Sequence, residues 1–317
     1  MKAILLALIG VLSMFCATLL AQEVSPATQK AVLITGASTG IGRNMAETLA
    51  AEGFFVYAGA RKQTDIVALT AIDNIMGVRL DVTIQEEIDA AVELITAEGR
   101  GLFGLVNNAG VAVVGPLIET DEDDMQFQMD VNLFGPYRVT KAFAPLIIAS
   151  KGRIATTGSI SGILSGPLLG AYSMSKHGVE AFTDALAGEM RKFDVHVSVI
   201  EPGNYVSAII GTLKQRIEAR GQSTEGSLYA EEMNRMLGGM ESNYDKGPDD
   251  VSAALLKFLT NENPKRRYMV VPERRQAEVT IRKAIEELVQ LNEGHEYSYD
   301  RAELISMLDE ALGKTDE

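Results

Sequence analysis

From residue 31 onward, short apolar runs alternate with stretches of helical spacing. The runs read as buried parallel strands at Ala31–Ile34, Phe54–Tyr57, Val78–Leu80, Phe103–Val106, Arg153–Thr156, Val195–Ile200 and Tyr268–Val271. Helices are predicted over residues 44–52, 84–97, 121–149 and 171–192, the third disturbed near Gly135-Pro136. This alternation predicts the α/β class, a single domain built on a doubly wound parallel sheet.

The chain begins with a segment of different character. Residues 3–21 are almost wholly apolar, with Lys2 before them, and their length is close to that needed to span a bilayer. We expect an uncleaved membrane anchor at residues 1–21. The alternatives are a buried helix or a signal peptide, whose cleavage would leave a secreted or periplasmic protein. A small-residue cleavage signal is only partly present, because Leu19 lies two positions before Ala21.

The rest of the chain divides at two further points. Residues 22–29 are polar, contain Ser25-Pro26 and read as a linker to the domain at residues 30–273. Within that domain, residues 205–245 predict one or two helices with glycine-rich joints. Residues 274–317 form a helical, acidic extension. The extension could be a cap, a partner surface or a piece that contacts a membrane, and the sequence does not choose among them.

Composition excludes several classes of function. The chain has 43 acidic and 29 basic residues and a net charge of −14, which argues against a nucleic-acid partner. Cys16 is the single cysteine, so disulfides within the chain and thiolate metal sites are excluded. The three histidines are widely spaced, which argues against a histidine-rich metal site or a Ser-His-Asp triad. We expect no bound metal.

A glycine-rich turn follows the first predicted strand. It places Gly36, Gly40 and Gly42 around Ser38, Thr39 and Ile41, directly before a predicted helix. Glycines here allow a tight turn and a close approach of the backbone to a pyrophosphate at the helix N-terminus. The other interpretation is an ordinary tight turn. The strand–turn–helix context favours dinucleotide binding.

The end of the second strand bears on the choice of dinucleotide. Enzymes that use NAD commonly place an acid there, whereas this chain has Gly59-Ala60-Arg61-Lys62. A 2′-phosphate would attract Arg61, so we predict NADP, with NAD as a second possibility. Both cations could instead be solvated loop charges. Asp81, at the end of the third strand, either contacts adenine or caps the next helix.

One helix carries the residues on which a catalytic interpretation depends. Tyr172 and Lys176 are four apart and therefore point the same way, and Ser159 lies upstream. A neighbouring ammonium makes the phenolate easier to form, and a phenol that exchanges its proton near neutral pH suits carbonyl/alcohol interconversion. Without this context, Tyr172 and Lys176 could simply be neighbours on the exposed surface of a helix.

With these elements in order, residues 30–271 resemble the short-chain dehydrogenase/reductase family, whose members have a Rossmann fold. The resemblance rests on the glycine spacing and on motifs that occur together and in order: Asn107-Asn108-Ala109-Gly110, Asn132, Ser159, Tyr172, Lys176 and Pro202-Gly203. Segments 201–204 and 264–268 look similar to those of steroid- and retinol-dehydrogenase-like members. The resemblance implies an NAD(P)-binding catalytic domain.

Carried over residue by residue, the resemblance implies roles. Tyr172 would be the general acid/base, Ser159 would hydrogen-bond the substrate oxygen, Lys176 would hold the nicotinamide ribose, and Asn132 would support a water that links Lys176 to solvent. The expected cofactor-binding residues are Gly36, Ser38, Thr39, Gly40, Ile41, Gly42, Arg61, Asp81, Asn108, Ala109, Gly110, Tyr172, Lys176, Pro202 and Gly203.

The flanks of the proposed site are apolar at residues 111–116, 167–169 and 205–210, which suits a small hydrophobic, steroid-, retinoid- or lipid-like alcohol or carbonyl. A catalytically idle NAD(P)-binding scaffold is one alternative. A sugar-nucleotide epimerase or dehydratase is another, disfavoured by the glycine spacing and the lack of a sizeable polar substrate domain. The resemblance also implies a homodimer or homotetramer through helices 121–149 and 171–192.

Overall fold

A seven-stranded parallel sheet forms the centre of the molecule. The computed structural model describes residues 29–221, 223–239 and 245–313. In these residues the strands lie in the order β3-β2-β1-β4-β5-β6-β7, and every neighbouring pair is parallel. Their bounds are β1 Ala31–Ile34, β2 Phe55–Ala60, β3 Ile75–Arg79, β4 Gly104–Asn107, β5 Arg153–Thr157, β6 His196–Pro202 and β7 Arg267–Val270. The predicted fold class, a doubly wound parallel sheet, is confirmed.

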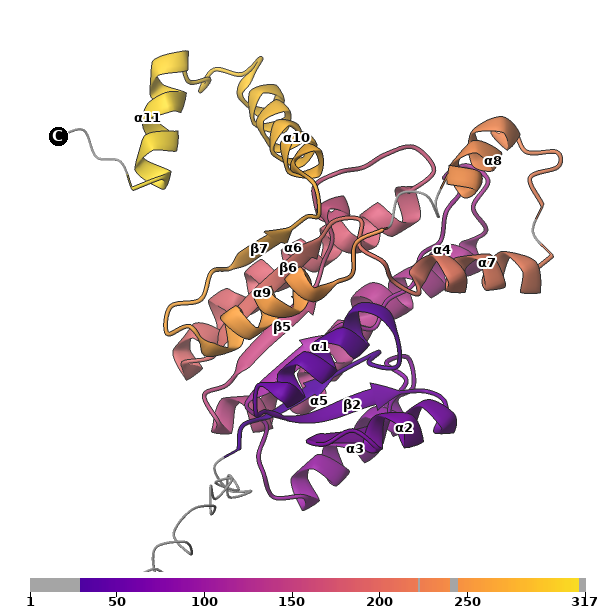
Figure 1. Cartoon of the computed structure of the whole chain (residues 1–317). Coiled ribbons are helices and arrows are strands. Elements are labelled where there is room, and N and C mark those ends of the chain that lie inside the picture. The colour runs from indigo at the N-terminus through magenta and orange to yellow at the C-terminus, as the bar shows by residue number, and fades with distance from the viewer. Residues whose placement is uncertain (1–28, 222, 240–244, 314–317) are drawn as a thin grey trace, which may run out of the picture.

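Helices cover both faces of this sheet (Figure 1). The helices of the domain are α1 Gly40–Ala51, α2 Gln63–Thr70, α3 Gln85–Ala97, α4 Glu122–Met129, α5 Gly135–Ala149, α6 Gly170–Met190, α7 Ile209–Ala219, α8 Ala230–Gly239 and α9 Asp249–Thr260. β1 shows how the two faces are filled. Val32 and Ile34 belong to one buried cluster, and Ala31 and Leu33 belong to the other, as the alternation of a strand requires.

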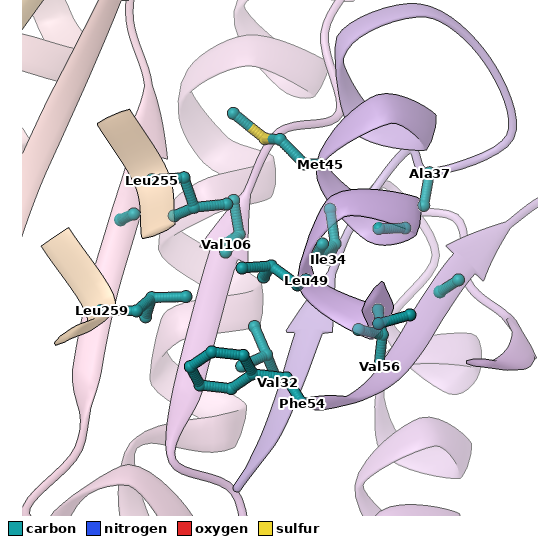
Figure 2. Packing of buried hydrophobic residues seen from close by; sticks show 14 of the residues in the cluster. Val32, Ile34, Ala37, Met45, Leu49, Phe54, Val56, Val106, Leu255 and Leu259 are labelled. Carbon is teal, nitrogen blue, oxygen red and sulfur yellow. The ribbon is translucent and has the colours of Figure 1, made fainter. Parts of the chain in front are cut away.

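The cluster on the first face joins α1 and α9 to the sheet. Figure 2 shows Met45 and Leu49 of α1 with Leu255 and Leu259 of α9, packed over Val32 and its neighbours. The opposite cluster contains residues of α3, α5 and α6. Both faces of every central strand are therefore buried, which is why these strands read as continuous apolar runs rather than alternating ones.

Several elements differ from the sequence expectation. Two helices were not predicted, α2 and α9. α2 buries only Leu69, so it has almost no apolar stripe to detect. α1 begins at Gly40 rather than at residue 44, since the glycine turn itself forms its first turn. β2 runs on to Ala60, because its last residues pair with β3.

The long helical region at residues 121–149 is interrupted directly before Gly135-Pro136, which confirms the predicted disturbance near these residues. A π-helical turn at Asp130–Phe134 separates α4 from α5, and Pro136 lies in the first turn of α5. Proline has no N–H to donate to the preceding turn, so the regular hydrogen-bond ladder cannot continue through it. The adjustment is made before the proline, at the turn that carries Asn132.

Two more helices, α10 Arg274–Asn292 and α11 Arg301–Ala311, follow β7 and extend away from the body of the molecule (Figure 1). The predicted anchor and linker at residues 1–21 and 22–29 lie outside the described residues, except for Gln29. Among the described helices, none is both long enough and apolar enough to cross a bilayer.

Candidate active site

A cavity of about 310 Å³ lies at the carboxyl ends of β1 to β6. It includes the switch point between β1 and β4, where the chain order of the sheet reverses and where open α/β sheets bind ligands. The predicted site residues that line this one cavity are Gly36, Ser38, Thr39, Gly40, Ile41, Gly42, Arg61, Asp81, Asn108, Ala109, Gly110, Ser159, Tyr172, Lys176, Pro202 and Gly203. Residues from six separate turns thus converge.

The glycine turn is tightly fitted. Gly36 has φ of +64°, and a Cβ there would lie 2.7 Å from the Cα of Ala109. A Cβ on Gly42 would overlap the Gly36 backbone and the Asn108 amide. Both positions therefore need glycine for physical reasons, one for its backbone angle and both for space.

The start of α1 is suited to an anion. Its N-cap, Thr39, makes no side-chain cap hydrogen bond, and its first turn contains no acid. Gly40, Ile41 and Gly42 line the cavity at this point. Uncapped helix N–H groups and the positive end of the helix dipole favour a phosphate group. The turn therefore fits the pyrophosphate of a dinucleotide.

Thr35 and Asn108 hold this turn against the end of β4. The Thr35 hydroxyl accepts from the N–H of Asn108 at 2.9 Å and of Ala109 at 3.0 Å. The Asn108 side chain donates to the Thr35 carbonyl at 3.1 Å and accepts from the Thr157 hydroxyl at 3.2 Å. Thr35 was not singled out in the sequence, although it directly precedes the first glycine.

Arg61 and Asp81 lie together at the other end of the cavity. The Arg61 side chain is 62% exposed, and its guanidinium lies 3.8 Å from the Asp81 carboxylate. The second Asp81 oxygen accepts from the N–H and hydroxyl of Thr83 at 3.0 and 2.7 Å. Asp81 thus closes a turn before α3, whose N-cap is Ile84, so it does not itself cap the helix. Lys62 is the N-cap residue of α2.

Ser159 lies just after β5. Its side chain accepts from the N–H of Ser161 at 3.1 Å and so caps the short 3₁₀ turn Ile160–Gly162. Since the oxygen accepts this bond, the hydroxyl hydrogen can be donated to another acceptor. The residue is buried and lines the cavity.

Tyr172 and Lys176 are on the first two turns of α6. The Lys176 ammonium lies 5.7 Å from the centroid of the Tyr172 ring and donates to the Thr157 carbonyl at 2.8 Å. Lys176 is buried, and burial lowers its pKa to about 8, with the Glu180 carboxylate acting in the opposite direction. A charged group from which water is excluded interacts strongly with neighbouring dipoles and charges.

Asn132 is buried behind the cavity lining, on the π turn. Its side chain accepts from the N–H of Val111 at 2.8 Å and donates to the Val111 carbonyl at 3.0 Å. It also donates to the Ser175 hydroxyl at 3.1 Å, which in turn donates to the Tyr172 carbonyl at 2.7 Å. Asn132 therefore connects the segment after β4 to the helix that carries Tyr172 and Lys176.

Ser175 and Gln128 complete this connection and were missed in the sequence. Gln128 accepts from the N–H of Val113 at 2.6 Å and donates to the Val111 carbonyl at 3.0 Å. Ser175 could have been found, because it lies three residues from Tyr172 on the same helix. For Gln128, the signal was only its spacing of four from Asn132.

Two carboxyl groups are buried beside the site. Glu180, one turn after Lys176, interacts electrostatically with Glu201, which directly precedes Pro202-Gly203. Arg267 of β7 contacts Glu180 at 3.1 Å. Burial, followed by the charge of Glu180, raises the pKa of Glu201 to about 8, so the pair retains a proton at neutral pH.

An ion pair holds α7 over the cavity. The Arg216 guanidinium on α7 contacts the buried Asp124 carboxylate on α4 at 2.5 Å and stacks 3.8 Å from the Phe127 ring centroid. Ile209 and Ile210, at the start of α7, line the cavity. The position of this apolar wall therefore depends on a contact with α4.

Comparisons with known proteins agree with this geometry. The sequence profile of the short chain dehydrogenase family (adh_short) matches residues 30–217, more than half of the chain. D-beta-hydroxybutyrate dehydrogenase of Bos taurus is 35% identical over 273 residues, covering 78% of each chain. A 3-ketodihydrosphingosine reductase of Bacteroides thetaiotaomicron is 34% identical, covering 76% of this chain and 87% of that protein. Retinol dehydrogenase 16 of Rattus norvegicus is 32% identical, with coverage of 83% and 87%.

Solved structures show the same fold. A short-chain dehydrogenase from Streptomyces avermitilis superposes with a TM-score of 0.69 at 27% identity, covering 91% of this chain and 99% of that chain. A short chain dehydrogenase/reductase from Burkholderia phymatum in complex with NAD gives 0.72 at 24% identity, with coverage of 86% and 97%. One from Burkholderia cenocepacia in complex with NADP gives 0.65 at 21% identity, with coverage of 83% and 95%.

Proposed function

Because the chain belongs to the short chain dehydrogenase family of oxidoreductases, we propose that it interconverts a lipophilic alcohol and its ketone or aldehyde with NADP(H). One observation carries the proposal. Ser159, Tyr172 and Lys176 line the same cavity as the glycine turn that fits a pyrophosphate. The glycine turn would hold the pyrophosphate of a dinucleotide, whose nicotinamide would exchange a hydride with a substrate held by these three side chains.

In this proposal the cofactor and each of four residues have distinct tasks. The cofactor supplies or accepts the hydride. Tyr172 gives a proton to the carbonyl oxygen or takes one from the alcohol, and Ser159 donates a hydrogen bond to the same oxygen. Lys176 orients the cofactor ribose and, by its charge, favours the tyrosinate. Asn132 fixes the segments on which the other residues lie and supports the water link between Lys176 and solvent.

The first test is Tyr172→Phe, which removes the hydroxyl and keeps the ring. We expect turnover to fall about 10²- to 10⁴-fold, the usual contribution of a positioned general acid/base. The assay follows the absorbance change of the nicotinamide. Tyr137→Phe, on the exposed face of α5, is the matched control and is expected to keep full activity. Full activity of Tyr172→Phe would point to a different proton donor, and no turnover by the wild type would favour the idle scaffold.

The preference for NADP over NAD is proposed on the cation at the end of β2. Arg61 lines the cavity where NAD-dependent enzymes commonly place an acid, and its exposed guanidinium suits a 2′-phosphate. Binding the phosphate requires Arg61 to leave or share its contact with Asp81. That contact is 3.8 Å long and the Arg61 side chain in it is largely exposed, so the cost of loosening it is small.

Arg61→Ala tests this preference. A charge-assisted hydrogen bond contributes about 1.5–3 kcal/mol, so kcat/KM with NADPH is expected to fall about tenfold to a hundredfold while kcat/KM with NADH changes little. Lys62→Ala, the neighbouring cation, is the control. A wild type that prefers NADH, or an equal loss with both cofactors, would remove the role given to Arg61.

A lipophilic substrate is proposed from the cavity wall. The apolar residues that line it beside the proposed catalytic residues are Val111, Ala112, Val114, Leu169, Ile209 and Ile210. Among the described lining residues, the cations are Arg61 and Lys176. In this proposal both cations bind the cofactor, so no cation of the wall remains to pair with the carboxylate of an acidic substrate.

Substrate panels decide between classes. Retinoid, steroid and long-chain 3-keto compounds are compared with short hydroxy acids, each with NADPH and NADH. We expect higher kcat/KM for the lipophilic compounds. Higher kcat/KM for a short hydroxy acid would instead place this chain with its hydroxybutyrate-dehydrogenase relatives in substrate class.

We also propose that residues 3–21 attach the enzyme to a membrane, since this apolar segment has the length of a span. Membranes from cells that express the full chain are washed with alkaline carbonate. Retention of the full chain, together with release of a chain that starts at residue 22, is the expected result. A shortened mature N-terminus by mass spectrometry would indicate a cleaved signal.

A further inference from the structure

Helix α10 presents a broad apolar face to solvent. It buries only Thr280 among its residues. The exposed fractions of its larger apolar side chains are 51% for Ile281, 54% for Ile285, 50% for Leu288, 44% for Val289 and 76% for Leu291. The helix projects beyond β7, the edge strand of the sheet (Figure 1). A surface helix normally turns such a face toward a core.

The apolar positions have the spacing of a helix-pairing seam. Ala277, Ile281, Ala284, Leu288 and Leu291 follow one another at intervals of three and four residues. We call these five residues the α10 seam. Ala284 is its midpoint, with two seam residues on either side. A small residue at the centre lets a second helix approach closely, and Ala277 in one half balances the larger Leu291 in the other.

Charge divides the helix at the same midpoint. Residues 274–283 contain Arg274, Arg275, Arg282 and Lys283 with Glu278, a net charge of +3. Residues 284–292 contain Glu286 and Glu287 and no cation, a net charge of −2. An antiparallel second copy of the helix would place each basic half against an acidic half. A parallel copy would place like charges together.

We propose that the α10 seam binds the α10 seam of a second copy of this chain, antiparallel and around a two-fold axis near Ala284. The two features on which this rests are the three- and four-residue spacing of the seam, with Ala284 at its midpoint, and the opposite charges of the two halves of the helix. A two-fold contact requires one surface to complement itself, and α10 meets that requirement. The contact is additional to the one expected through the helices at residues 121–149 and 171–192.

A disulfide test exploits the symmetry. In a full chain carrying Cys16→Ser, Ala284→Cys lies near the axis, so the two copies are expected to cross-link readily under mild oxidation. Leu291→Cys is the matched control. Residue 291 lies seven residues from the axis in each copy. The two sulfur atoms would therefore be about 21 Å apart along the helices, too far to form a disulfide. Cross-linking of both variants, or of neither, would overturn the proposal.

A charge-swap series tests the pairing independently in the full chain. Arg282→Glu with Lys283→Glu is expected to halve the particle mass measured by light scattering, as is Glu286→Lys with Glu287→Lys. Combining all four substitutions restores opposite halves and should restore the wild-type mass. A lipid surface, the segment at residues 3–21 or another protein does not change charge with the variant and predicts no rescue. The swap also restores the 3.1 Å pair between Lys283 and Glu287 within one helix, so helix content is compared in every variant. Circular dichroism and NADPH binding report folding, and unchanged mass in all variants would overturn the proposal.

Discussion

The buried carboxyl pair beside the site is the residue-scale feature with the clearest energetic consequence. Glu201 is the last residue but one of β6 and Glu180 lies on α6, and neither is more than 8% exposed. Arg267 contacts one of them, and Asp184 lies nearby with its own contact to Arg267 at 2.6 Å. The positive charge of Arg267 is thus shared among three carboxyl groups, so retention of a proton is the least costly state.

This state makes stability depend on pH. The pKa of Glu201 is raised from 4.5 to about 8, so the folded state holds its proton more tightly than the unfolded state. The resulting stabilisation is complete below the unfolded pKa and is lost as pH rises through about 8. We expect the free energy of unfolding of the wild type to fall by a few kcal/mol between about pH 6 and about pH 9 on account of this group.

Glu201→Gln should remove that dependence, because its amide cannot ionise. Urea unfolding of the variant and the wild type at both pH values gives the comparison. Glu93→Gln, on the exposed surface of α3, is the control and should keep the wild-type dependence. Equal loss of stability on raising the pH in Glu201→Gln and the wild type would show that the pair does not hold the proton.

At the scale of elements, the contact between α7 and α4 controls the cavity wall. Arg216→Ala removes the 2.5 Å contact to the buried Asp124 carboxylate, which Arg220 also approaches, at 3.5 Å. Loss of a charge-assisted contact costs on the order of 2 kcal/mol. We expect α7 to be held less firmly beside the cavity, so that KM rises about tenfold or more while kcat changes less. Steady-state kinetics measure the split. Arg235→Ala, exposed on α8, should leave both constants unchanged, and an effect of Arg216→Ala on kcat alone would contradict this reading of α7.

A helix or strand could be predicted from the sequence where its burial leaves a visible pattern of apolar residues. The strand runs were visible because both faces of the sheet are covered, and the glycine turn because Gly36 needs a positive φ. α2 could not be predicted, because most of its surface is exposed and it has almost no apolar stripe. The interaction of Asn132 with Val111 was also hidden, because it joins segments 21 residues apart through a π turn that no periodicity indicates. Likewise, the Arg61–Asp81 contact follows from the pairing of β2 with β3 rather than from either residue alone.

At the scale of the whole molecule, the cavity joins both halves of the sheet. Its lining comes from the turns after six strands, so a dinucleotide bound there contacts segments far apart in the chain. A ligand that binds only the folded state adds about 2.7 kcal/mol at a concentration a hundred times its Kd. We expect NADPH at that excess to raise the thermal midpoint by several degrees, measured by differential scanning fluorimetry.

Gly42→Val should abolish that shift, since its side chain would overlap Gly36 and Asn108 at the phosphate turn. The control is Gly188→Ala on α6, where an added Cβ meets nothing within 4 Å. This control should keep the full shift and gain about 0.5–1 kcal/mol of helix stability. The midpoint without NADPH separates loss of binding from loss of folding.

The π turn at Asp130–Phe134 can be regarded as a single-residue insertion between two helices that must face different ways. α4 meets α7 through Asp124, while Val139 and Phe143 of α5 pack into the sheet cluster. Deleting one residue here would restore a continuous α-helix and rotate one half relative to the other by about 100°. The number of residues at this point therefore sets how far α4, with its contact to α7, is rotated about the helix axis relative to α5 and the core. No side-chain substitution can change that rotation.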